Sequence, residues 1–176
     1  MGAVRVIVGR LCAIVCFLGT VSYMVGFSTP WWLEGDDLNA KAGLWQNCVG
    51  GHCVSTVKID IGDWLIACQA LSITALLTSL MSLGVVLVML RASRPSAVSA
   101  ARKGLIATTL ITGLAASITL AVYYLRRELT YPADLYKISS SFCLALVGGA
   151  LFLVISLVTT IDVITARLCH SSQDQS

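Results

Sequence analysis

The chain has 176 residues, of which 57% are hydrophobic and only 12% are charged, and its mean hydropathy is +0.85. About a quarter of the residues in an ordinary soluble domain are charged, so this composition argues against a soluble protein and indicates burial in a bilayer. The length allows one domain. The formal net charge of +3 is small and scattered, so no nucleic-acid partner is expected.

Four apolar stretches pass the length test for crossing a membrane, which takes about 20 residues. In chain order they are 11–27, 65–90, 104–125 and 141–161. A backbone in lipid must satisfy its own hydrogen bonds, so each stretch is predicted to be a helix. Short connections make neighbouring helices antiparallel. The expected fold is an all-α transmembrane, up-down four-helix bundle, formed by a single domain over residues 1–176.

The basic residues predict the orientation. The N-terminus, the loop 91–103 and the tail 162–176 lie on one side, and the loops 28–64 and 126–140 lie on the other. The first side carries Arg5, Arg10, Arg91, Arg94, Arg102, Lys103 and Arg167, and the second carries Lys41, Lys58, Arg126, Arg127 and Lys137. Because short cytoplasmic segments are enriched in Lys and Arg, both termini are expected in the cytoplasm.

The first stretch has a second interpretation, as a cleavable signal peptide. It has a basic start and an apolar middle, and Gly26 and Ser28 are small enough for a cleavage site. Cleavage would leave three spans. The segment is expected instead to remain as an uncleaved membrane anchor.

Two cysteines lie on the oxidising side, Cys48 and Cys53, where disulfides form. Gly50 and Gly51 between them favour a two-residue hairpin turn, because such turns need positive φ. That turn places Cys48 opposite Cys53 at a non-hydrogen-bonded pair, where Cα atoms are about 4.5 Å apart. The spacing suits a disulfide.

The residues around this hairpin predict a small extracellular antiparallel β-sheet. An isolated two-stranded hairpin is marginally stable, so a further strand is expected to complete it. The expected strands are 43–47, 54–59 and a third near 30–34.

The other cysteines have a different environment. Cys12, Cys16, Cys68 and Cys143 lie within or at the edge of the apolar stretches, where a thiol behaves as a small hydrophobe. Cys169 follows the fourth stretch beside Arg167, and a juxtamembrane cysteine of this kind is a candidate for reversible palmitoylation. Asp162 is expected to be an end-of-helix residue near Arg167.

A motif in the first loop resembles the signature of the claudin superfamily, a Trp followed by Gly-Leu-Trp-x-x-Cys and a second Cys. The matching residues are Trp32, Gly43, Leu44, Trp45, Cys48 and Cys53. The resemblance to claudins, peripheral myelin protein, epithelial membrane proteins and lens intrinsic protein covers all four spans. Gln69 stands where claudins usually carry Arg and is similar to the epithelial membrane and myelin branch.

The resemblance also suggests contact residues in the first loop. Lys58, Asp60 and Asp63 follow the second cysteine, where claudins place pore-lining residues, and Asp36 and Asp37 add to an acidic rim that could attract cations. The alternative is an ordinary solvated loop surface. Trp31, Trp32 and Trp45 have two interpretations as well, as adhesion residues or as residues that hold the sheet on the bundle.

The sequence and the resemblance together predict a non-enzymatic structural membrane protein of cell–cell contacts and junctions, acting as a paracellular barrier or pore. The alternative is an auxiliary subunit of an ion channel or receptor. The expected location is the plasma membrane, including cell–cell junctions. Expected partners are the lipid bilayer, further copies of the chain in cis and in trans, and other claudin-like proteins or a channel. No catalytic residues, metal site or cofactor are expected.

Overall fold

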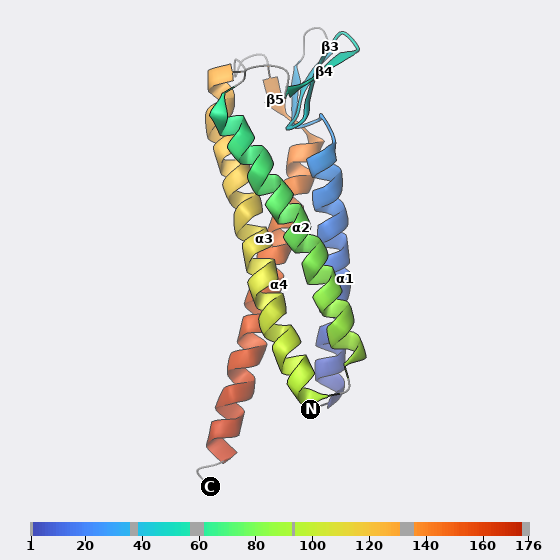
Figure 1. The fold of residues 1–176 in the computed structure, drawn as a ribbon, viewed down its shortest axis with the longest axis vertical. Helices are drawn as coiled ribbons and strands as arrows, with labels where there is room; N and C mark the ends of the chain where they lie inside the picture. The colour runs from blue at the N-terminus through green and yellow to red at the C-terminus, as the bar shows by residue number, and fades with distance from the viewer. Residues whose placement is uncertain (1, 36–38, 57–61, 93, 131–135, 174–176) are drawn as a thin grey trace.

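Four long helices run side by side in the computed structural model, and a small sheet covers one end of them (Figure 1). The structure describes residues 2–35, 39–56, 62–92, 94–130 and 136–173. Side chains are described for most of these, but not for residues 2–6, 8, 95, 128–130 and 167–173. The helices are α1 (Gly2–Ser28), α2 (Asp63–Arg91), α3 (Pro95–Thr130) and α4 (Ser140–Gln173).

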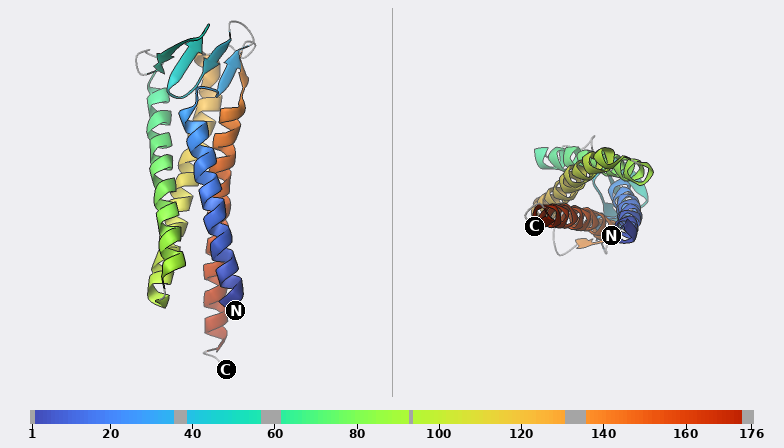
Figure 2. Two further views of the ribbon diagram at one scale, coloured as in Figure 1. Left: turned by 90° about the vertical axis from the view of Figure 1, so that its right-hand side faces the viewer. Right: turned by 90° about the horizontal axis from the view of Figure 1, so that it is seen from below.

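Each helix is long and apolar enough to cross a membrane, over 9–28, 63–91, 96–127 and 140–166. The bundle is up-down, with α1 beginning and α4 ending at the end opposite the sheet (Figures 1 and 2). The predicted all-α transmembrane fold with a small antiparallel sheet is therefore present. We call the two ends of the bundle the sheet end and the terminal end.

The helices extend past the predicted spans. Most of the connection predicted at 91–103 is the first part of α3, which begins at Pro95, a residue favoured at the first helical position because it lacks an N–H donor. Much of the predicted tail at 162–176 is likewise helical, because α4 continues to Gln173. On the other side of the connection between the second and third helices, α2 ends at Arg91, because the backbone is extended at Ala92.

Hydroxyl side chains inside the bundle mostly bond to the carbonyl one turn earlier on their own helix, as Thr20 does to Cys16 and Thr119 to Ala115. This satisfies the hydroxyl without water. Thr112 of α3 also donates to the Thr78 hydroxyl of α2 at 2.7 Å, which links two helices directly.

The sheet has five strands in the order β4-β3-β2-β1-β5, all antiparallel to their neighbours. They are β1 (Leu33–Gly35), β2 (Ala40–Ala42), β3 (Gln46–Val49), β4 (His52–Ser55) and β5 (Tyr136–Ile138). Two strands were not expected: β2 lies between the predicted strands, and β5 comes from the second loop and pairs with β1. The strand predicted at 43–47 begins only at Gln46, because Gly43 to Trp45 form a turn.

Candidate functional site

The β3–β4 hairpin carries a disulfide between Cys48 and Cys53, whose Cα atoms are 4.0 Å apart. The two cysteines are directly opposed, and so are Val49 and His52 next to the turn. Gly50 and Gly51 have φ of 58° and 84°, which residues with a Cβ rarely adopt. The glycine pair therefore sets the register that brings the two sulfurs together.

We expect Cys48→Ser to impair delivery of the protein to the cell surface. The closed loop is short, so its entropic contribution falls below the roughly 3 kcal/mol of a 15-residue loop. The bridge mainly holds the edge strand β4 in register with β3. Surface biotinylation measures the effect, with the free Cys143→Ser as control. Normal delivery of Cys48→Ser, together with a freely alkylated Cys53 in the wild type, would contradict this.

Trp32 joins the sheet to three helices. It is 1% exposed, and its indole Nε1 donates to the Gly26 carbonyl of α1 at 2.6 Å. Its ring lies edge-on to Tyr123 of α3 and Phe142 of α4, with centroids 4.8 and 5.7 Å away. Since β1 begins at the next residue, this side chain anchors the start of the sheet on the bundle.

Gly43 is needed because backbone approaches it closely. A Cβ at this position would lie 2.6 Å from the Cα of Pro30, so any side chain would collide with main chain that cannot move aside. The Gly43 N–H donates to the Gln46 carbonyl at 2.9 Å and closes the turn before β3. The signature glycine thus packs this turn against the segment that leaves α1.

The carbonyl of Leu44 is the centre of a small hydrogen-bond network. It accepts from the Gln69 Nε2 of α2 at 2.8 Å and from the Thr56 hydroxyl at 3.0 Å. Gln69 also donates to the Thr56 Oγ1 at 3.1 Å, and the Thr56 N–H donates to the Trp45 carbonyl. Leu44 and Thr56 are buried, so α2 holds both ends of the hairpin through one amide.

We expect Gln69→Leu to lower the free energy of unfolding by about 1–3 kcal/mol, because it removes two hydrogen bonds worth about 0.5–1.5 kcal/mol each, while Thr56 still donates to the Leu44 carbonyl. Gln69→Arg, the residue that claudins usually carry, keeps a donor near Leu44 and should be milder. Thermal unfolding in detergent, monitored by size-exclusion chromatography, measures the stability of both variants. Equal melting temperatures for wild type and Gln69→Leu would rule out this role.

Trp45 is half-buried, and its ring lies edge-on to Phe27 at the end of α1, 5.2 Å between centroids. Phe27 in turn stacks on Tyr23. The signature residues therefore act as one unit, the sheet–bundle junction, made of Trp32, Gly43, Leu44 and Trp45 together with Gln69 and Thr56. Of these, the sequence singled out Gln69 only as a difference from claudins, and Thr56 not at all.

A model of the PMP-22/EMP/MP20/Claudin family matches residues 7–160. The chain belongs to this family. Among known proteins, the epithelial membrane protein 1 of Mus musculus is 34% identical over 71 residues, 40% of each chain. That of Oryctolagus cuniculus is 38% identical over 52 residues, 30% of this chain and 32% of the relative. That of Rattus norvegicus is 30% identical over 71 residues, 40% of each. These matches span about two-fifths of the relatives' length or less.

The outer face of this family member's sheet carries a charged row. Glu34 of β1 lies between Lys41 of β2 and Lys137 of β5 in the strand register, so the three side chains share one face. The Ser139 hydroxyl donates to the Glu34 carboxylate at 3.3 Å. The Lys41 ammonium lies 3.7 Å from the ring centre of Trp31, which is 42% exposed. The face directed away from the bundle is thus polar.

Only one of the predicted contact or pore residues lies among the described residues. Asp63 is exposed in the first turn of α2, where a carboxylate favours the helix N-terminus. Asp36, Asp37, Lys58 and Asp60 lie outside the described residues. Cys169 is in α4, among the residues whose side chains are not described. Among the described residues, no group of three or more His, Cys, Asp or Glu could hold a metal ion.

Proposed function

We propose that the chain acts at cell–cell contacts, as a plasma-membrane protein whose sheet end faces outside and whose terminal end faces the cytoplasm. Membership of the PMP-22/EMP/MP20/Claudin family, a group of non-enzymatic membrane proteins, supports this. The orientation is supported by seven basic residues that fall on the terminal-end segments. The membrane-embedded parts are then about 11–27, 65–90, 104–125 and 141–161.

The observation that carries the proposal is the shape of the sheet. The sheet–bundle junction holds it firmly on the helices, while both of its edges, β4 and β5, have no neighbouring strand among the described residues. Val49 and Val54 in the β3–β4 hairpin and Ile138 on β5 are 49%, 46% and 39% exposed. Open strand edges with apolar side chains favour pairing with another chain.

We infer that the partner is a second copy of the same chain. The two edges differ in sequence, so pairing β4 of one copy with β5 of the next is heterologous and does not close on itself. Such contacts extend into a row in the plane of the membrane. Trans contacts then involve Asp36, Asp37, Lys58 and Asp60 of the first loop and Asp63 at the start of α2, as contact or pore residues. Palmitoylation of Cys169 would strengthen membrane attachment on the cytoplasmic side.

Mixed cultures of expressing and non-expressing cells test the proposal. The tagged protein should concentrate at borders between two expressing cells and not at mixed borders. Val54→Lys places a charge on the β4 edge and should reduce the enrichment, because lysine on an edge strand disfavours pairing. Gln46→Lys adds the same charge at an exposed position one strand further in and is the matched control.

Equal signal at matched and mixed borders would reject homotypic contact. Co-purification of a stoichiometric pore-forming protein in mild detergent would then favour the auxiliary-subunit alternative. The orientation is tested separately, because a terminal tag should be labelled only after permeabilisation.

A further inference from the structure

The terminal end of the bundle carries four exposed cations from four different parts of the fold. Arg10 lies in α1, Arg91 ends α2, Arg94 lies in the turn before α3, and Lys103 lies in α3, all of them exposed. Among the residues whose side chains are described, the only acid at this end is Asp162 of α4.

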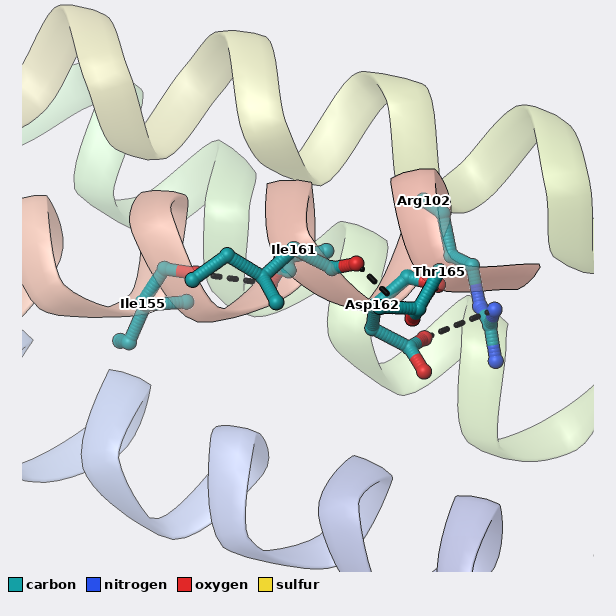
Figure 3. Close-up of polar contacts among 6 residues, drawn as sticks. Arg102, Ile155, Ile161, Asp162 and Thr165 are labelled. Atoms are coloured by element: carbon teal, nitrogen blue, oxygen red, sulfur yellow. Dashed lines mark hydrogen bonds and ion pairs between the residues drawn. The ribbon is translucent and has the colours of Figure 1, made fainter. Parts of the chain in front are cut away.

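Asp162 does not neutralise this cluster, because it is already paired. Its Oδ2 lies 2.9 Å from the Arg102 Nη1 of α3, and the two side chains are 30% and 18% exposed (Figure 3). The Thr165 hydroxyl donates to the Ile161 and Asp162 carbonyls on the same helix. Arg102 and Asp162 therefore form a self-contained link between α3 and α4. The sequence suggested Arg167 as the nearby cation, but Arg102 is the partner found.

Arg10 and Arg91 lie at the same level of the bundle, on helices that are in contact there. A Cβ on Gly9 would lie 3.7 Å from the side chains of both Leu90 and Met89, so α1 and α2 are in contact at this level. Arg10 and Arg91 are each the next residue after that contact, and Arg94 follows three residues on. Like charges gathered at one end of the bundle repel each other, and an anion bound among them relieves this repulsion.

The position of the cluster points to a lipid anion. The apolar span of α2 ends at Arg91, so we expect its guanidinium at the depth of the lipid headgroups. All three residues are arginines, whose planar fork binds phosphate oxygens through two hydrogen bonds at once. Basic clusters beside membrane helices attract anionic headgroups of the cytoplasmic leaflet.

We propose that Arg10, Arg91 and Arg94 form a binding site for the headgroup of a phosphorylated inositol lipid. Its phosphomonoesters supply several negative charges on one headgroup, which matches three guanidinium groups from adjacent elements. In the cell the site requires the orientation given under the proposed function. The binding itself does not, so it can be tested on the purified chain.

The test titrates the full-length protein in mild detergent with short-chain phosphatidylinositol bisphosphate, and with short-chain phosphatidylserine for comparison. Native mass spectrometry measures the bound fraction. The bisphosphate lipid should bind one per chain and more tightly than phosphatidylserine. Arg10→Gln/Arg91→Gln should weaken it about 25-fold, since each arginine contributes about fivefold near a lipid surface.

Arg126→Gln/Lys137→Gln removes the same charge from exposed residues at the sheet end and should change the affinity less than twofold. Equal weakening in both double variants, or equal affinity for the two lipids, would overturn the site. Wild-type affinity for the bisphosphate lipid should also fall steeply as salt is raised. An affinity independent of salt would overturn the proposal without relying on any variant.

Failure of contact enrichment in cells, with lipid binding intact, would count against the proposed function alone.

Discussion

Replacing Trp32 by Ala should cost about 3–5 kcal/mol of the free energy of unfolding, the range for removing a buried large aromatic side chain. The side chain is 1% exposed, and its loss removes the hydrogen bond to Gly26 and the ring contacts to Tyr123 and Phe142. The sheet then loses the contacts that Trp32 makes with α1, α3 and α4 together. We expect retention inside the cell and a large fall in melting temperature.

The adjacent Trp31 is the matched control. It is 42% exposed and contacts the Lys41 ammonium, so Trp31→Ala removes an exposed cation–π contact of about 0.5–1 kcal/mol. Trp32→Phe should fall between the two, because it keeps a ring and loses the N–H donor. A Trp31→Ala variant as unstable as Trp32→Ala would contradict the assignment of Trp32 to the sheet–bundle junction.

Gly26→Ala should destabilise the contact between α1 and α4 by about 1–3 kcal/mol, the usual cost of overpacking a close-packed core. A Cβ at Gly26 would lie 2.6 Å from the Ala145 backbone nitrogen and 2.7 Å from the Ser141 carbonyl oxygen. These are main-chain atoms of α4, so the helices must separate. Gly148→Ala should act similarly, since its Cβ would lie 2.8 Å from the Tyr23 backbone nitrogen.

Gly84→Ala is the matched control, and the opposite result is expected for it. Thermal unfolding in detergent measures the stability of all these glycine variants. Nothing lies within 4 Å of a Cβ at Gly84, so the added methyl group meets open space in α2. Alanine is favoured over glycine in a helix by up to about 1 kcal/mol, so stability should stay equal or rise slightly. Equal losses at Gly26 and Gly84 would show that the close approach of α1 and α4 does not govern the effect.

The junction explains why the signature contains residues of such different kinds. Trp32 supplies buried aromatic area and one donor, Gly43 allows the approach of Pro30, and Leu44 offers a backbone acceptor to Gln69. Each is required by a contact with a different part of the bundle. The same arrangement leaves the outer face and both edges of the sheet uncovered by the described residues, where contact with another chain is proposed.

The sequence alone determined the features that depend on local chemistry. Four apolar stretches of sufficient length can only be helices in lipid, and all four are present. The hairpin register also follows locally, because Gly50 and Gly51 allow the turn that sets Cys48 opposite Cys53.

Only the tertiary structure decided which distant residues meet. The strands β2 and β5 have three residues each, too few for a recognisable alternation, and β5 exists because β1 offers it an edge. The pairing of Asp162 with Arg102 likewise depends on how α3 lies against α4, which no spacing along one helix encodes. Gln69 shows the same limit, since its amide matters only because the fold brings the Leu44 carbonyl within 2.8 Å. Periodicity and turn chemistry act over a few residues, whereas these contacts join segments that are brought together only when the helices pack.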